Sequence, residues 1–286
     1  MLDTPTATQG QFTRYETRGA VAWVFMNRPK YANTQNYRML DELDALFRRA
    51  VEDDTIRAIV LAGEGKHFSA GHDLGTPDAD NDLPRERKLL WDNHLTKDKG
   101  GAERQFTVEQ DVYLGLCRRW QDIPKPTVAM VQGACIAGGL MLAFACDLVV
   151  ASEDAFFQDP VLAFGVPGVE YYSHMFDLPP RIAREFLYLG QRMPAARAHH
   201  FGLINRMVPR EELETVTTEI TESLAKIPPF GFKLAKQAMT MIDDARGKRT
   251  VNDGIFGLHH LAHAHSQLTT GSLAGGLDPK KVKEGS

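Results

Sequence analysis

Apolar residues recur along the chain with two periods, which indicates a fold built from both strands and helices. Runs rich in Val, Ile, Ala and aromatic residues predict strands, and apolar stripes spaced three to four residues apart predict helices. The expected strands are residues 12–17, 20–26, 58–62, 127–131 and 147–151. The expected helices among them are residues 34–54, 106–121 and 137–146. Because strands and helices alternate, we predict an α/β fold with a parallel sheet.

The last third of the chain has the pattern of a helical region. Five segments there carry helical spacing: residues 179–189, 194–201, 210–225, 230–243 and 252–268. By contrast, residues 75–101 are dominated by Asp, Asn, Lys and Gly. That stretch is too long for an ordinary connection, so we expect a mobile lid, an insertion, or both.

Composition and charge narrow the class of protein. With 33 basic and 37 acidic side chains, the 286 residues carry a formal net charge of −4, which removes the electrostatic case for a nucleic-acid-binding protein. No apolar stretch approaches the roughly 20 residues of a membrane-spanning helix, and the N-terminus is polar, unlike a secretory signal. Cys117, Cys135 and Cys146 form no CxxC pair. We therefore expect a cytoplasmic protein with reduced thiols and no membrane association.

Two glycine-containing segments carry the candidate chemistry. KHFSAGHDL (66–74) follows the strand AIVLA, and GACIAGGLMLAFACD (133–147) follows the strand TVAMV. Small residues at the end of a strand let backbone N–H groups face a ligand. Gly138 and Gly139 open a helix, whose first N–H groups have no partner within the helix. A carbonyl oxygen held there is polarised, and an enolate is stabilised by roughly 2.7–4 kcal/mol per donor.

These motifs resemble the crotonase (enoyl-CoA hydratase/isomerase) superfamily over nearly the whole chain. Before them, NRPKYAN (27–33) is similar to the family's N-R-P-x-x-x-N segment. After them, residues 193–208 and 230–239 are similar to its later helices. The resemblance implies a crotonase-like ββα spiral core in residues 1–200 and a C-terminal helical trimerisation region in residues 201–286. It also implies a homotrimer or a dimer of trimers.

The same resemblance implies an acyl-CoA thioester as substrate, with coenzyme A as part of the substrate and no other cofactor. The thioester carbonyl would be held by the backbone N–H groups of His72 and Gly138. Lys66, Phe68 and Ala70 would lie along the adenine and pantetheine. Asp73, which we expect to brace the loop, is counted with Met141 and Val161 among the substrate-binding positions.

Two departures from the family pattern bear on the reaction. Hydratases of the family use two glutamates, and the corresponding positions here are Met141 and Val161. Neither side chain can donate or accept a proton, and loss of one positioned acid or base typically costs about 10²–10⁴-fold in rate. We therefore expect this chain not to be an ordinary enoyl-CoA hydratase.

Four other side chains are candidates for the proton transfer. Glu170 follows a Pro-Gly turn, and we expect it to open the next helix, where it could serve as a base or only stabilise the helix N-terminus. Asp159, His72 and His174 are weaker candidates, Asp159 because Pro160 suggests a capping role. The interpretation we favour is an enzyme that stabilises a thioester enolate. The alternatives are an isomerase or C–C bond hydrolase using Glu170, and a catalytically silent acyl-CoA-binding subunit.

A histidine cluster lies near the C-terminus. His259, His260, His263 and His265 include a pair spaced four residues apart, which shares a helix face. No HExxH pattern or nearby cysteine accompanies them. We therefore predict surface or subunit-contact histidines and no metal site.

Overall fold

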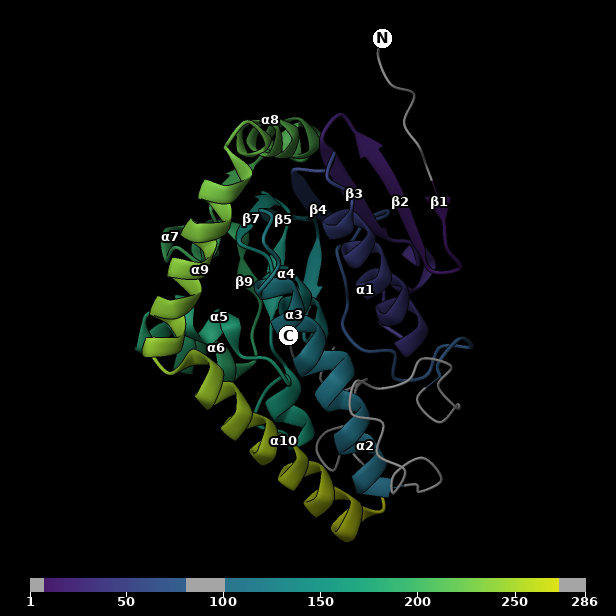
Figure 1. The fold of residues 1–286 in the computed structure, drawn as a ribbon. Coiled ribbons are helices and arrows are strands. Elements are labelled where there is room, and N and C mark those ends of the chain that lie inside the picture. The colour runs from purple at the N-terminus through teal and green to yellow at the C-terminus, as the bar shows by residue number, and fades with distance from the viewer. Residues whose placement is uncertain (1–7, 81–100, 273–286) are drawn as a thin grey trace.

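The computed structural model describes residues 8–80 and 101–272 (Figure 1). Its strands are β1 (Thr8–Gln9), β2 (Thr13–Arg18), β3 (Val21–Met26), β4 (Ala58–Gly63), β5 (Thr127–Val131), β6 (Ala134–Ile136), β7 (Leu148–Ser152), β8 (Phe156–Gln158), β9 (Met193–Pro194) and β10 (Arg206–Val208). Its α-helices are α1 (Tyr37–Glu52), α2 (Gly101–Glu109), α3 (Leu116–Gln121), α4 (Gly138–Ala143), α5 (Ser173–Asp177), α6 (Pro180–Leu189), α7 (Ala195–His200), α8 (Leu213–Ala225), α9 (Pro229–Ala245) and α10 (Lys248–Thr270). Most of the 75–101 segment, the expected lid or insertion, lies outside the described residues.

The central sheet has seven strands in the order β1-β2-β3-β4-β5-β7-β10. The first three strands pair antiparallel, and β3, β4, β5, β7 and β10 pair parallel. This confirms the predicted α/β class and all five predicted strands, with small shifts at their ends. Strands β3, β4 and β5 are buried on both sides, as their unbroken apolar sequences require.

Side chains of alternating residues build one core on each face of this sheet. On one face, Val24 and Leu61 belong to the larger core, which includes the apolar side of α1. On the other, Trp23 and Val60 pack with Leu213 of α8, which lies across the sheet in Figure 1. The helical region expected to begin at residue 201 thus includes β10 and α8, which complete the sheet layers. Its role in trimerisation stays a prediction.

A second, smaller sheet contains β6, β8 and β9. Ser69, in the loop after β4, joins Cys135 of β6 through an isolated bridge, and β6 in turn pairs with β8. Segments that follow successive strands of the large sheet are therefore stacked next to one another. None of these short strands was predicted, because two or three residues carry no measurable period.

The helical segment predicted at residues 106–121 is longer and less regular than expected. It begins with α2, passes through a π-helical segment η2 (Gln110–Gly115) and ends with α3. A π-helical turn is rare and often accompanies a functional site. Within the described ranges, no helix is long and apolar enough to cross a membrane.

Candidate active site

The two glycine-containing turns lie directly against each other. A Cβ built on Gly71, whose φ is +92°, would lie 3.2 Å from the backbone nitrogen of Gly138. A Cβ built on Gly138 would lie 2.5 Å from the imidazole of His72. Ala137, just before Gly138, has a φ of +47°, a strained value for a residue with a side chain. A residue with a side chain at Gly138 would therefore have to displace His72.

The backbone N–H groups of His72 and Gly138 make no backbone hydrogen bond within the described residues. Gly71 and Asp73 hydrogen-bond to Gln35 through the Gly71 carbonyl and the Asp73 N–H, and the intervening His72 N–H takes no part. Gly138 is the first residue of α4, so its N–H has no partner within the helix. Within the described residues, neither N–H group is therefore taken up by a backbone acceptor.

A buried ion pair stabilises the first of the two glycine-containing turns, KHFSAGHDL (66–74), which is called the first turn below. Arg28 donates from Nη2 to Oδ2 of Asp73 at 2.9 Å, and both side chains are buried. Thr76 and Gly75 also donate backbone N–H groups to Asp73. Burial alone would raise the pKa of Asp73, but the hydrogen bonds from Thr76, Arg28 and Gly75 outweigh it and lower that pKa. These contacts tie the Asp73 carboxylate to the turn itself, which is the bracing role expected of it.

The NRPKYAN segment supports the same region. Asn33 accepts from the Arg28 N–H at 2.8 Å and donates to the carbonyl oxygens of Glu64 and His67 at 3.0 and 2.9 Å. The asparagine has a φ of +52°, which Asn tolerates better than most side chains. Asn33 thus ties the NRPKYAN segment (27–33) to Glu64 and His67, at the start of the first glycine-containing turn.

Glu170 lies in a buried cluster of ionisable side chains. Its Oε1 is 3.2 Å from Nε2 of His259 and 3.8 Å from Nδ1 of His72. The His72 ring stacks on Tyr113 of η2, with ring centroids 4.0 Å apart. The structure thus brings together side chains from four distant segments: the first turn, η2, the loop before α5, and α10.

The position of Glu170 corrects one expectation. The residue does not open a helix, because α5 begins three residues later, at Ser173. The intervening Tyr172 donates its N–H to Oδ1 of Asn252 at 2.7 Å, so α10 helps to hold this segment in a non-helical conformation. Glu170 is therefore not a carboxylate that stabilises a helix N-terminus.

Charges around Glu170 determine its ionisation. Burial raises its pKa, but His72 and His259 outweigh burial and hold the pKa of Glu170 below its usual range. Burial also lowers the pKa of His72, more than Glu170 raises it. Burial likewise works against the charge of His259, but Glu170 prevails and raises the pKa of His259 to about 9. His259 is therefore the cation that pairs with the Glu170 carboxylate.

Glu109 and His260 extend the cluster. Burial, followed by the nearby Glu170 charge, raises the pKa of Glu109 to about 8. Burial, followed by the charges of His259 and His263, lowers the pKa of His260 to about 4. The cluster thus contains two buried glutamates with opposite pKa shifts, and strongly perturbed pKa values gather at functional sites.

His259 corrects the expectation of a surface histidine, whereas the alternative expectation, a subunit contact, stays a prediction. It is 3% exposed, not a surface histidine, and it contacts Glu170. Glu109 and Tyr113 were missed altogether, because neither belongs to a recognisable motif. The only signal in the sequence was the four-residue spacing of His259 and His263.

Two other proton-transfer candidates form a separate pair. Asp159 and His174 are both fully buried, with Oδ2 and Nε2 3.7 Å apart. Neither ring nitrogen of His174 has a hydrogen-bond partner among the described residues. Oδ1 of Asp159 accepts a long hydrogen bond, 3.4 Å, from the Val161 N–H. Within the described ranges, this pair makes no hydrogen bond or ion pair with Glu170.

The expected substrate-binding residues differ in exposure. Lys66 is exposed at the start of the first turn. The side chain of Phe68 is wholly buried in the main core. Ala70 is half-buried, Met141 is buried in α4, and Val161 is partly buried against the core.

Comparison with known proteins gives one consistent family. The enoyl-CoA hydratase/isomerase family model matches residues 16–99 and 94–271. A Mycobacterium tuberculosis protein that carries the name enoyl-CoA hydratase EchA13 is 40% identical, covering 93% of this chain and 85% of the relative. The 1,2-epoxyphenylacetyl-CoA isomerase of Escherichia coli is 30% identical, covering 80% and 82%.

Solved structures agree with the sequence relatives. A crystal structure titled as a probable enoyl-CoA hydratase from Mycobacterium thermoresistibile has a TM-score of 0.83 and 38% identity, covering 92% of this chain and 99% of that one. With motifs, fold and relatives in agreement, the chain belongs to the enoyl-CoA hydratase/isomerase family of the crotonase superfamily, a family of enzymes.

Proposed function

We propose that this chain binds an acyl-CoA thioester and stabilises its enolate between the backbone N–H groups of His72 and Gly138. The observation that carries the proposal is the direct contact of the two turns, with neither N–H group taken up by a backbone hydrogen bond within the described residues. Donors that are already oriented cost no reorganisation when negative charge develops on the thioester oxygen. The Arg28–Asp73 pair holds the first of the two turns in place.

We further propose that Glu170 transfers the proton and that the reaction is an isomerisation. Its carboxylate is buried beside the imidazole of His72, whose backbone would hold the thioester oxygen. Moving a proton between two carbon atoms needs one carboxylate, which accepts the proton and returns it. Ordinary hydration in this family uses two glutamates, and Met141 and Val161 occupy their positions. One relative, the 1,2-epoxyphenylacetyl-CoA isomerase of Escherichia coli, carries the name of an acyl-CoA isomerase.

Exchange of the α-hydrogens of butyryl-CoA in D₂O, followed by mass spectrometry, tests enolate formation without knowledge of the true acyl group. We expect exchange with the native protein. Glu170→Gln keeps the shape of the side chain but removes the proton acceptor, so exchange should fall at least ~10²-fold. The dissociation constant for butyryl-CoA should change little. Glu185→Gln, at an exposed ion pair on α6, is the matched control.

The outcomes separate the rival functions. Undiminished exchange in Glu170→Gln would remove Glu170 from the mechanism and direct attention to Asp159, His174 and the His72 side chain. Tight binding of butyryl-CoA without exchange by the native protein would favour the catalytically silent subunit. Absence of acyl-CoA binding would refute the proposal as a whole.

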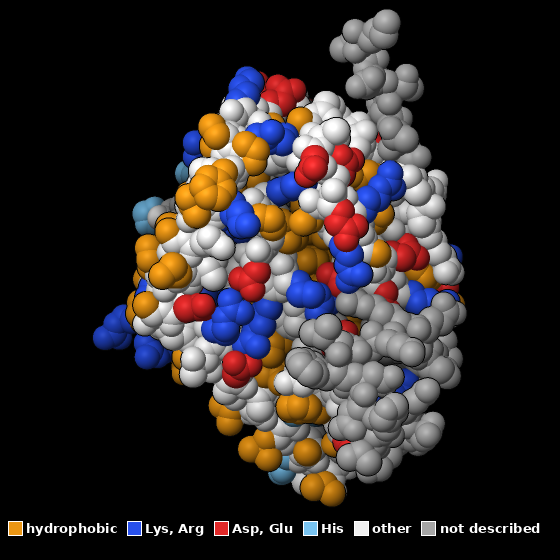
Figure 2. Space-filling model, viewed as in Figure 1, with side chains coloured by type: hydrophobic (Ala, Val, Ile, Leu, Met, Phe, Trp, Pro, Cys, Tyr) orange, Lys and Arg blue, Asp and Glu red, His pale blue; other side chains and the backbone are white. Residues whose placement is uncertain are grey.

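We also propose that the chain assembles as a homotrimer or a dimer of trimers. Large apolar side chains on α9 and α10 are exposed in the single chain, including Met241 at 71% and Leu261 at 66%. Figure 2 shows hydrophobic side chains gathered along these two helices. Burial of apolar surface drives association. Sedimentation equilibrium should give a mass of three or six chains, and a monomer at micromolar concentration would contradict the proposal.

A further inference from the structure

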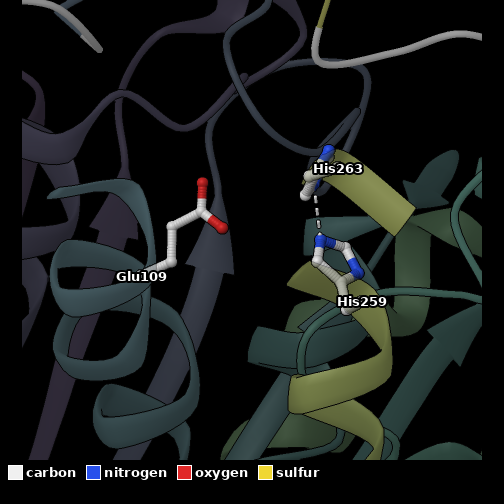
Figure 3. Close-up of side chains that lie close together, drawn as sticks. All are labelled: Glu109, His259 and His263. Atoms are coloured by element: carbon white, nitrogen blue, oxygen red, sulfur yellow. Dashed lines mark hydrogen bonds between the residues drawn. The ribbon is translucent and has the colours of Figure 1, made fainter. Parts of the chain in front are cut away.

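Three potential metal ligands meet where α2 and α10 pack together. His259 and His263 are about one helical turn apart on α10, with their Nε2 atoms 2.8 Å apart. Glu109, the last residue of α2, faces them, as Figure 3 shows. One donor atom from each of the three residues lies within 4.8 Å of the other two.

His259 is already oriented as a metal-binding histidine would be. Its Nδ1 lies 2.8 Å from the carbonyl oxygen of Gly168. A carbonyl oxygen only accepts, so Nδ1 carries a proton and Nε2 is the nitrogen that faces His263. A backbone carbonyl in this position commonly fixes the tautomer and ring orientation of metal-bound histidines.

Glu109 gives independent evidence for a cation-binding site. The residue is 6% exposed, and among the described residues its Oε2 has no hydrogen-bond partner. Oε1 accepts from Nε2 of Gln105 at 3.0 Å. Nε2 of His260 is 3.4 Å from Oε2 but makes no hydrogen bond with it. A buried carboxylate oxygen without a partner is costly, and a cation would satisfy it.

We propose that Glu109, His259 and His263 bind a divalent transition-metal ion, for which Zn²⁺ is the best match. Two imidazole nitrogens and one carboxylate oxygen are a usual zinc donor set with a fourth position open. The sequence alone predicted no metal site, because it showed neither the burial of His259 nor the approach of Glu109.

Small movements complete the site. Donor atoms about 2.0–2.2 Å from a tetrahedral Zn²⁺ are about 3.3–3.6 Å from one another. The two histidine nitrogens would therefore separate slightly, and the Glu109 carboxylate would move toward them. The ion displaces the protons held by these ligands, so binding releases protons.

Such an ion would join α2 to α10 and would lie beside Glu170. It would compete for Nε2 of His259, which otherwise contacts Glu170 at 3.2 Å. The proposal does not rest on the acyl-CoA function, because metal binding is measured without any thioester. Failure of one proposal is therefore distinguishable from failure of the other.

Calorimetric titration of the chelator-treated full chain with Zn²⁺ tests the site. We expect one Zn²⁺ per chain and a rise in the midpoint of thermal unfolding, because the ion binds the folded state. His263→Ala and Glu109→Gln should each weaken binding at least ~10-fold. His265→Ala, at an exposed histidine on the same helix, is the matched control and should bind as tightly as the native protein. Co²⁺ should give the visible absorption of a tetrahedral site.

Three results would overturn the proposal: no stoichiometric binding by the native protein, undiminished binding by His263→Ala, or an equal loss in His265→Ala. The partly exposed position of His263 makes its alanine variant the safer of the two to fold. If Glu109→Gln does not fold, as circular dichroism would show, the comparison of His263→Ala with His265→Ala decides the matter by itself.

Discussion

Removal of the Asp73 carboxylate should destabilise this protein strongly, because it breaks a buried ion pair. Arg28 and Asp73 have side chains that are 3% and 0% exposed, with 2.9 Å between Nη2 and Oδ2. Asp73→Ala leaves the Arg28 guanidinium buried without this partner and removes the acceptor for the Thr76 and Gly75 N–H groups. Breaking a buried pair typically costs about 3–5 kcal/mol. For a chain of this size, that lowers the thermal midpoint by roughly 6–10 °C.

Urea unfolding followed by circular dichroism measures the effect, at one fixed protein concentration because an oligomer's stability depends on concentration. Asp154→Ala is the control. Asp154 pairs with Arg210 at 2.7 Å, but these side chains are 47% and 40% exposed, so about 0–1 kcal/mol should be lost. Equal losses of unfolding free energy in the two variants would refute the argument that burial makes the Arg28–Asp73 pair contribute more to stability than an exposed pair.

The remaining predictions concern pH and activity. Folding lowers the pKa of Asp73. The stability that the Asp73 carboxylate contributes is therefore complete above its pKa in the unfolded chain, about 3.9, and is lost as the pH falls through its lower pKa in the folded protein. The difference in unfolding free energy between native protein and Asp73→Asn should consequently narrow below about pH 4. The family resemblance implies that Met141 and Val161 stand at the positions of the two hydratase glutamates, so crotonyl-CoA hydration, followed by loss of enoyl absorbance, should be near background. Turnover near ~10 s⁻¹ would show that this assignment is wrong or that other acids were missed. Gly138→Ala should cut butyryl-CoA exchange about 10²–10³-fold with unchanged circular dichroism. The backbone N–H is retained in this variant, but the new Cβ would lie 2.5 Å from the His72 imidazole and would force the two turns apart. Full activity would show that the close approach of the two turns is not needed for exchange.

Local patterns determined much of the architecture. The apolar run AIVLA predicted a buried parallel strand, and β4 is one. The apolar stripe in residues 34–54 predicted a helix, and α1 forms there with Asn36 as its cap, whose side chain accepts from the Met39 N–H. The glycines of both turns were recognised from their position after strands. Such features are readable because hydrogen bonding and side-chain alternation act between residues close in sequence.

The tertiary structure decided how the ionisable side chains meet. His72, Glu109, Glu170 and His259 come from four separate segments, and their burial and pKa shifts exist only once α2, η2 and α10 pack around the first turn. Asn252, 80 residues away along the chain, bonds the segment that carries Glu170 and so overrides the local expectation of a helix start. Charge and burial at one atom depend on every element packed around it, and one-dimensional spacing does not contain that information.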